Sequence, residues 1–144
     1  MAIWFKAFST AYAKERGLKT MIDHLGIEIL EAGDDYLRGR MPVDARTRQP
    51  AGVLHGGASV AFAETLASWA ASFCVDPSQH HCVGIEINAN HVRPVSEGYV
   101  LGTARPLNLG RTLQVWEVRI ESEQGKLVCI SRVTMAVLKK ASEY

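Results

Sequence analysis

Residues 56–73 read GGASVAFAETLASWAASF, and this stretch decides the fold. From Ala58 to Phe73 it consists almost entirely of Ala, Val, Phe, Leu, Trp and Ser, with neither Gly nor Pro. A helix that is apolar almost all round its circumference lies buried in a protein, not on its surface. The stretch therefore predicts one long buried central helix, around which the rest of the chain is arranged.

Strand-like segments lie on both sides of this helix in the sequence. Two precede it, at Gly26–Glu31 and Tyr36–Met41, with a turn at Gly33–Asp35 between them. Four follow it: Val83–Val92, Tyr99–Leu107, Leu113–Glu121 and Leu127–Val137. Two strands, one buried helix and four strands predict an α+β fold, in which an antiparallel sheet of about six strands wraps around the helix.

The length of 144 residues suits a single domain, and no repeat, low-complexity tract or linker divides it. We therefore expect one domain over residues 1–144. Residues 1–20 are expected to form a helical extension, because Phe5–Leu18 mixes apolar and charged positions as a surface helix does, and Gly17 supplies a stop.

The composition bears on partners and compartment. The 16 basic and 15 acidic residues give a net charge of +1, with no sign of the basic patch that a nucleic acid or a membrane surface would require. No stretch approaches the roughly 20 apolar residues of a membrane span, and Lys6 interrupts the start before a signal-peptide core develops. Cys74, Cys82 and Cys129 are odd in number and scattered, which argues against a disulfide framework and favours a cytoplasmic protein.

Glu64 is the one residue that does not fit the apolar helix. A carboxylate in such surroundings is costly unless it is paired, exposed or used in chemistry. The helix holds no Lys or Arg, so no ion pair along the helix can compensate for it. Glu64 either points to solvent on a narrow polar stripe, with Ser68 one turn on, or serves as a reactive group.

The start of the helix favours the second alternative. Leu54-His55-Gly56-Gly57 leads directly into the helix, so unpaired backbone N–H groups should lie near the two glycines. Such donors can stabilise the oxyanion that develops when a thioester is attacked. An ordinary glycine-rich entry into a crowded helix remains the alternative. Gln49 and His55 add polar groups in the preceding loop.

Other kinds of site find less support. No metal site is expected, because the histidines lack any recognised ligand spacing and no cysteine pair assists them; the residues considered are His55, His80, His81 and His91. Ser59 and Ser68 are not expected to be nucleophiles, because neither lies in a G-x-S-x-G elbow.

Three segments together resemble a known family. They are residues 49–57 (QPAGVLHGG) with Glu64 and Ser68 after them, residues 84–94 (GIEINANHVRP) and residues 106–111 (PLNLGR). They closely resemble the hotdog-fold acyl-CoA thioesterases of the PaaI-like, helix-glutamate 4-hydroxybenzoyl-CoA thioesterase type. This branch also includes 1,4-dihydroxy-2-naphthoyl-CoA thioesterase and the proofreading thioesterase of enterobactin synthesis. The resemblance extends from about Leu25 to Leu138.

The resemblance implies a role for each catalytic candidate. Glu64 would be the nucleophile or the general base, and Ser68 would stand near the attacking group or water. Gln49 and the Gly56 N–H would polarise the thioester carbonyl, and His55 would help to shape and orient that pocket. No cofactor is implied, since CoA is part of the substrate.

The same resemblance places the CoA arm along two segments. The implied residues are Val83, Asn90, His91, Val92 and Arg93, together with Leu107, Asn108, Leu109, Gly110, Arg111 and Thr112. Arg93 and Arg111 are suitable phosphate partners, because the guanidinium fork matches phosphate oxygens. Both arginines could instead be solvated charges at strand ends.

The spacing of Gly56 and Glu64 predicts a dimer. At a helical rise of about 1.5 Å per residue, eight residues separate them by roughly 12 Å along the axis. An attacking group must come within about 3–3.5 Å of the carbon whose oxygen the glycine N–H holds. Glu64 must therefore meet the Gly56 of another subunit, as two antiparallel central helices would allow. We expect a homodimer as the active unit and a homotetramer, a dimer of dimers, as the assembly.

These observations favour a hydrolase that converts acyl-CoA thioesters to free acid and CoA. Its acyl groups would be aromatic or otherwise bulky, such as 1,4-dihydroxy-2-naphthoyl or benzoyl. One alternative is a proofreading hydrolase that removes acyl groups from a carrier protein through the same phosphopantetheine arm. Another is a non-catalytic acyl-CoA sensor, against which Glu64 argues because a sensor needs no buried carboxylate.

Overall fold

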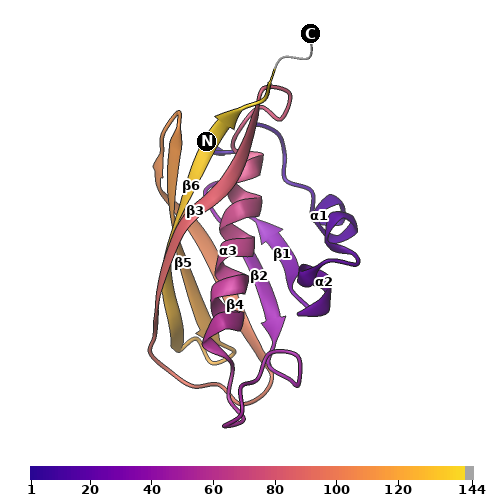
Figure 1. The fold of residues 1–144 in the computed structure, drawn as a ribbon, viewed down its shortest axis with the longest axis vertical. Helices are drawn as coiled ribbons and strands as arrows, with labels where there is room; N and C mark the ends of the chain where they lie inside the picture. The colour runs from indigo at the N-terminus through magenta and orange to yellow at the C-terminus, as the bar shows by residue number, and fades with distance from the viewer. Residues whose placement is uncertain (142–144) are drawn as a thin grey trace.

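The fold was obtained as a computed structural model, which describes residues 1–141 (Figure 1). The helices are α1 (Thr10–Gly17), α2 (Met21–His24) and α3 (Gly56–Phe73). The strands are β1 (Glu28–Ala32), β2 (Leu37–Pro42), β3 (His80–His91), β4 (Tyr99–Leu109), β5 (Leu113–Ser122) and β6 (Leu127–Lys139).

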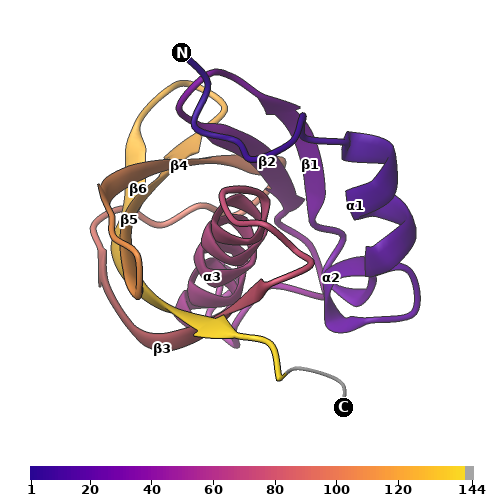
Figure 2. The same cartoon turned by 90° about the horizontal axis from the view of Figure 1, so that it is seen from above.

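A single antiparallel sheet wraps around α3, as Figure 2 shows with the helix seen nearly end-on. The strand order is β1-β2-β4-β5-β6-β3, which leaves β1 and β3 as the two edges. The expected α+β architecture is confirmed, and each expected strand matches an observed one to within a few residues at its ends.

The helix packs closely on the sheet because two glycines face each other beneath it. Gly39 of β2 and Gly102 of β4 are opposite one another in the ladder. A Cβ at Gly39 would lie 2.9 Å from Leu66, and one at Gly102 would lie 2.6 Å from the same side chain. Phe62 and Leu66 are fully buried. Apolar burial of this kind provides the main free energy of folding.

The N-terminal segment differs in part from the expected helix over Phe5–Leu18. α1 begins only at Thr10, where the Ser9 hydroxyl accepts a hydrogen bond from the Tyr12 N–H at 3.1 Å. Residues 4–8 instead run across the end of α3, where the Phe5 N–H donates to the Phe73 carbonyl at 2.8 Å. The helical expectation is therefore wrong for Phe5–Phe8, because backbone and aromatic contacts with α3 hold that stretch in a different conformation.

Aromatic packing fastens this segment to α3. Phe8 stacks at a tilt on Phe73, with ring centroids 4.3 Å apart, and both Phe8 and Tyr12 meet Trp69 nearly edge-on. α2, which the sequence reasoning did not anticipate, is a single short turn that lies on the same side of α3 as α1 (Figure 2). No helix within residues 1–141 has the length and hydropathy that crossing a bilayer requires.

Candidate active site

Glu64 lies half-buried at the middle of α3, and its carboxylate rests against β3. A Cβ built on Gly84 would lie 2.5 Å from the Glu64 Oε1 atom, so only a glycine leaves room for the carboxylate there. The ladder between β3 and β6 shifts register between Gly84 and Glu86. Within residues 1–141 the carboxylate has no hydrogen-bond partner and joins none of the five ion pairs. It therefore remains available to a ligand.

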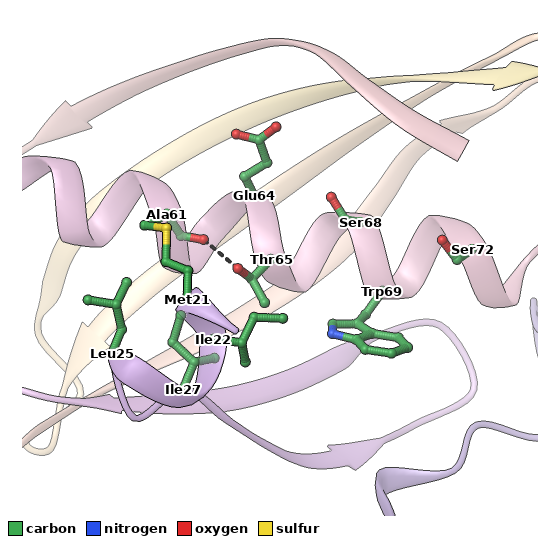
Figure 3. Close-up of a pocket in the computed structure, with 10 residues that line it drawn as sticks. All are labelled: Met21, Ile22, Leu25, Ile27, Ala61, Glu64, Thr65, Ser68, Trp69 and Ser72. Carbon is green, nitrogen blue, oxygen red and sulfur yellow. Dashed lines mark hydrogen bonds between the residues drawn. The ribbon is translucent and has the colours of Figure 1, made fainter. Parts of the chain in front are cut away.

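Glu64 borders a cavity of about 480 Å³ between α3 and the N-terminal segment, which we name the Glu64 cavity. Helix α3 contributes Glu64, Thr65, Ser68 and Trp69, and the segment around α2 contributes Met21, Ile22, Leu25 and Ile27. Figure 3 shows Thr65 and Trp69 pointing toward α2, while Glu64 and Ser68 extend from the other side of the helix. Apolar side chains with a few polar groups are typical of ligand pockets.

Two hydroxyl groups near Glu64 differ in their availability. The Thr65 hydroxyl donates to the Ala61 carbonyl at 2.7 Å, the usual local bond of a threonine inside a helix. Among the residues that the structure describes, the Ser68 hydroxyl makes one long hydrogen bond, to the Met135 sulfur at 4.0 Å. Ser68, one turn beyond Glu64, is thus the freer of the two.

The start of α3 is capped by His55. Its Nδ1 accepts a hydrogen bond from the Gly57 N–H at 2.8 Å, and its carbonyl accepts from Ala58 and Ser59. An imidazole that accepts through Nδ1 while neutral carries its proton on Nε2. Among residues 1–141 the Gly56 N–H finds no acceptor, so it is a free donor at the helix N-terminus. His55 fixes this helix start and does not line either the Glu64 cavity or the one described next.

A separate cavity of about 430 Å³ opens at this N-terminus, and we name it the Gly56 cavity. It brings together five of the predicted site residues: Gln49, Gly56, His91, Val92 and Arg93. The Gln49 Oε1 accepts a hydrogen bond from the Ala51 N–H, which leaves the amide NH₂ of Gln49 to donate elsewhere. The His91 ring lies over Gly56, since a Cβ there would be 2.9 Å from its Nε2.

Backbone hydrogen bonds fix the segments around the Gly56 cavity. The Leu54 N–H donates to the Val95 carbonyl at 2.7 Å and joins the Gln49 loop to the chain that follows β3. The Val92 and Arg93 N–H groups both donate to the Val128 carbonyl. These backbone hydrogen bonds therefore fix the main chain that carries Gln49 and the main chain that carries Arg93.

The structure does not bring all the predicted residues together in one chain. Glu64 and Ser68 line the Glu64 cavity, and no residue lines both this cavity and the Gly56 cavity. Val83 is opposite Ala136, which is opposite Leu113, so Val83 lies on the same part of the sheet as the β4–β5 loop that contains Arg111. That loop is at the other end of the sheet from the start of α3 (Figure 1).

The predicted CoA residues thus fall into separate groups. His91, Val92 and Arg93 belong to the Gly56 cavity, whereas Asn90 and Leu107 line a smaller hollow of about 220 Å³. The third group comprises Val83, Asn108, Leu109, Gly110, Arg111 and Thr112. Arg93 and Arg111 are exposed, and neither has a carboxylate within 4.0 Å among residues 1–141. Both guanidinium groups are free to meet an anionic ligand.

The cysteines are poor candidates for a nucleophile. Burial raises the pKa of the Cys74 thiol to about 12, with a smaller contribution from the neighbouring Cys82. Burial also raises the pKa of Cys82 and of Cys129, the latter against a hydrogen bond with Ser131. Since the thiolate is the reactive form, all three are unreactive near neutral pH.

Within the described 141 residues, no group of three or more His, Cys, Asp or Glu side chains is arranged to hold a metal ion.

Several residues of the site were missed by sequence reasoning. Gly84 could have been found, because a glycine inside a strand pattern often marks a close approach to the backbone. Met21, Ile22 and Leu25 carried no comparable signal. They belong to a helix of only four residues, which is too short for a hydrophobic period to be read.

Comparison with known proteins gives consistent results. Residues 51–129 match the family model of the thioesterase superfamily. The 1,4-dihydroxy-2-naphthoyl-CoA hydrolase of Escherichia coli is 46% identical over 136 residues, covering 94% of this chain and 99% of that protein. The proofreading thioesterase EntH of Cronobacter turicensis is 47% identical over 137 residues, covering 94% and 98%. A mutant thioesterase from Pseudomonas aeruginosa superposes with a TM-score of 0.95 at 44% identity, covering 96% of this chain and all of the other.

Proposed function

The chain belongs to the thioesterase superfamily and is a thioester hydrolase of the hotdog fold, and we propose that its substrates are acyl-CoA thioesters. The acyl groups would be aromatic or otherwise bulky, and the products would be the free acid and CoA. The observation that carries this proposal is the unpaired Glu64 carboxylate beside an apolar cavity of about 480 Å³. The relative of this chain in Escherichia coli is named for a naphthoyl-CoA substrate, which supports the choice of acyl group.

Glu64 can act in either of two ways. As a nucleophile, its carboxylate oxygen attacks the thioester carbon, the C–S bond breaks, and CoA leaves as a thiolate that takes a proton from water. A water molecule then hydrolyses the anhydride on Glu64 and releases the acid. As a general base, Glu64 takes a proton from a water molecule whose oxygen attacks the same carbon; the C–S bond then breaks, the acid is released, and the CoA sulfur leaves with the proton that Glu64 returns. Ser68 is suited to hold that water or the carboxylate in place.

The oxyanion requires donors on the other side of the reacting carbon. Within the described part of the chain, neither the Gly56 N–H, at the positive end of the α3 dipole, nor the Gln49 amide NH₂, which lines the same cavity, has a hydrogen-bond acceptor. Fixed donors of this kind stabilise charge that develops in the transition state, and the loss of one commonly costs about 10²–10³-fold in rate. His55 contributes by capping the helix that presents the Gly56 N–H.

These two sets of groups belong to different protomers in our proposal. Glu64 and Gly56 are about 12 Å apart along one helix, and they face different cavities. Glu64 of one protomer would therefore act on a carbonyl held by Gly56 and Gln49 of its partner. The dimer is the smallest assembly with a complete site.

The edge strand β3 is suited to form such a dimer. It has 12 residues and one unpaired edge, which favours pairing with another strand. Gly84 of β3 lies against Glu64, and His91 lies against Gly56. A twofold axis that brings Glu64 level with the partner's Gly56 must also bring Gly84 level with the partner's His91. The axis would then pass midway between these positions, near Ile87 and Asn88.

The same arrangement unites the separated CoA residues. Val83 and the β4–β5 loop with Arg111 lie at the end of the sheet near Gly84, and Arg93 lies beside Gly56. Across the twofold axis these groups would border one site. Arg93 of one protomer and Arg111 of the other could then hold the phosphates of a single CoA.

A carrier-protein thioester is the second candidate substrate. The relative in Cronobacter turicensis, named a proofreading thioesterase, favours it. The two candidates share the phosphopantetheine arm and differ in what lies beyond it. Matched acyl groups on CoA and on a carrier protein, compared by kcat/KM, distinguish them.

Subunit complementation tests the shared site. Glu64→Ala should lower kcat by at least about 10²-fold, as expected for the loss of a positioned base or nucleophile, and Gln49→Ala should also impair activity. When the two variants exchange subunits at random, about half the dimers are mixed, and each mixed dimer has one intact site. Activity should rise to roughly a quarter of wild type. If mixing, verified by mass spectrometry, leaves activity at the average of the two variants, both groups act within one chain and the shared site is wrong.

A further inference from the structure

A third cavity lies next to the Glu64 cavity, on the far side from the central helix. It has a volume of about 510 Å³ and lies beneath α1, so we name it the α1 cavity. Apolar side chains such as Ala13, Leu18 and Ile29 line it, together with the charged side chains of Lys14, Asp23, Glu28 and Arg46. Nothing in the proposed chemistry uses this space.

Three side chains line both the Glu64 cavity and the α1 cavity: Ile22, Ile27 and Trp69. Because the same side chains face both spaces, they form a wall between them. The wall is apolar and is built from α2, the segment before β1, and α3 (Figure 3).

The three members of this wall are held with unequal firmness. Ile27 is only 7% exposed and belongs to the core, and Trp69 is packed edge-on by Phe8 and Tyr12. Ile22 belongs to the four-residue helix α2 and is partly buried. Its Cγ2 lies within 3.3 Å of where a Cβ on Gly17 would be, so the end of α1 supports it from behind. Ile22 is therefore the member that can be shortened with least disturbance of the core.

We propose that this wall limits the size of the acyl group, and that Ile22 is the residue that separates the two cavities. The inference rests on the proposed function, since it assumes that the acyl group enters the Glu64 cavity. An acyl group in the Glu64 cavity would meet this wall on the side of the α1 cavity, and the wall would keep a longer chain out of that second space. Shortening Ile22 to alanine removes three carbon atoms from the wall and joins the Glu64 cavity to the α1 cavity.

The test compares straight-chain CoA thioesters of four, six, eight and ten carbons by kcat/KM in the intact protein. In Ile22→Ala the ratio of decanoyl-CoA to butanoyl-CoA should rise at least about tenfold over wild type, because a change of one methylene in an apolar pocket already alters selectivity about 10–200-fold. Two variants remove similar volume without breaching the wall. Leu25→Ala enlarges only the Glu64 cavity, and Ile29→Ala enlarges only the α1 cavity.

The control variants decide what a change in selectivity means. If Leu25→Ala raises the ratio as much as Ile22→Ala, the volume near Glu64 matters and the wall does not. If Ile22→Ala leaves the ratio unchanged while its melting temperature shows it to be folded, the proposal is overturned. Should Ile22→Ala fail to fold, Trp69→Phe thins the same wall and takes its place in the comparison.

A binding measurement separates this inference from the proposed function. If wild type hydrolyses none of the CoA thioesters, the proposed substrate class is wrong. Calorimetry with free butanoate and decanoate then still tests the wall. Ile22→Ala should bind decanoate at least about tenfold more tightly than wild type does, with butanoate little changed. Equal affinities of the two proteins for decanoate would refute the wall as a limit on chain length.

Discussion

The contact between Gly84 and Glu64 allows activity and stability to be separated in one substitution. In Gly84→Ala the new Cβ would lie 2.5 Å from the Glu64 Oε1, whereas ordinary contact begins at 3.4 Å. The carboxylate must therefore retreat by about 0.9 Å, and a misplacement of about 1 Å in a reacting group can cost 10²-fold in rate. The displaced atom is the end of a flexible side chain, so the fold should tolerate the change. Alanine is also favoured over glycine within a strand by roughly 0.5–1 kcal/mol.

We expect Gly84→Ala to lower kcat about 10²-fold without lowering the melting temperature or the dimer content. The assay is steady-state hydrolysis of an aryl-CoA, with thermal unfolding and light scattering on the same samples. Thr103→Ala is the matched control, because it lies in β4 of the same sheet, away from the proposed dimer edge, and lines none of the cavities described above. If Gly84→Ala keeps more than a third of the wild-type kcat, the position of this carboxylate against β3 does not matter for catalysis.

Further predictions concern the ligand, the helix start and the cysteines. Arg93→Ala and Arg111→Ala should mainly raise KM for a CoA thioester, more so at low salt, and leave KM unchanged for a thioester that lacks the nucleotide. An unchanged KM for the CoA thioester in both variants would mean that the phosphates bind elsewhere. His55→Ala should lower the free energy of unfolding by about 1 kcal/mol, because the Gly57 N–H loses its acceptor. His55→Asn, which supplies another acceptor, should lose much less. Equal losses in the two variants, measured by denaturant titration, would contradict the capping role. At pH 8 Cys74 should react with iodoacetamide about 10³-fold more slowly than free cysteine, since burial raises its pKa to about 12 from an ordinary 9.0; labelling at the free-cysteine rate, followed by mass spectrometry, would contradict this.

The central part of the fold could be predicted because its sequence signals are local and strong. An apolar run without glycine or proline indicated α3, and the observed helix Gly56–Phe73 extends it by only two residues. Glycine-containing turns separated several of the strands, and Gly98 and Gly125 indeed have φ values of +78° and +76°. The N-terminal segment could not be predicted in the same way. Its conformation depends on contacts with Trp69 and Phe73, which are distant in the sequence.

The candidate site could likewise be predicted where its residues are close in sequence, and not where distant segments meet. Residues that follow one another in sequence, such as His91, Val92 and Arg93, were readily grouped, and the structure places them around the Gly56 cavity with Gln49. The separation of Gly56 from Glu64 within one chain was foreseen from the helical rise alone. The wall of the Glu64 cavity was not foreseen, because it joins α2 to a residue of α3 more than forty positions away. No periodicity in one segment reports a contact with another.

Helices α3 and α2 differ in how extensively the rest of the fold holds them, and this difference has a consequence for specificity. Glu64, Ser68 and the Gly56 N–H each belong to the 18-residue helix α3, which is seated on the sheet, so each is held firmly within its own protomer. Ile22 belongs to a four-residue helix, which is held by the Thr20 cap and by packing on Gly17. With the acyl group in the Glu64 cavity, as we propose, substitutions in α2 would reshape its space while the Glu64 carboxylate and the Gly56 N–H keep their places. It follows that differences in acyl preference between proteins of this architecture should arise more from the segment around α2 than from the helix that carries the chemistry.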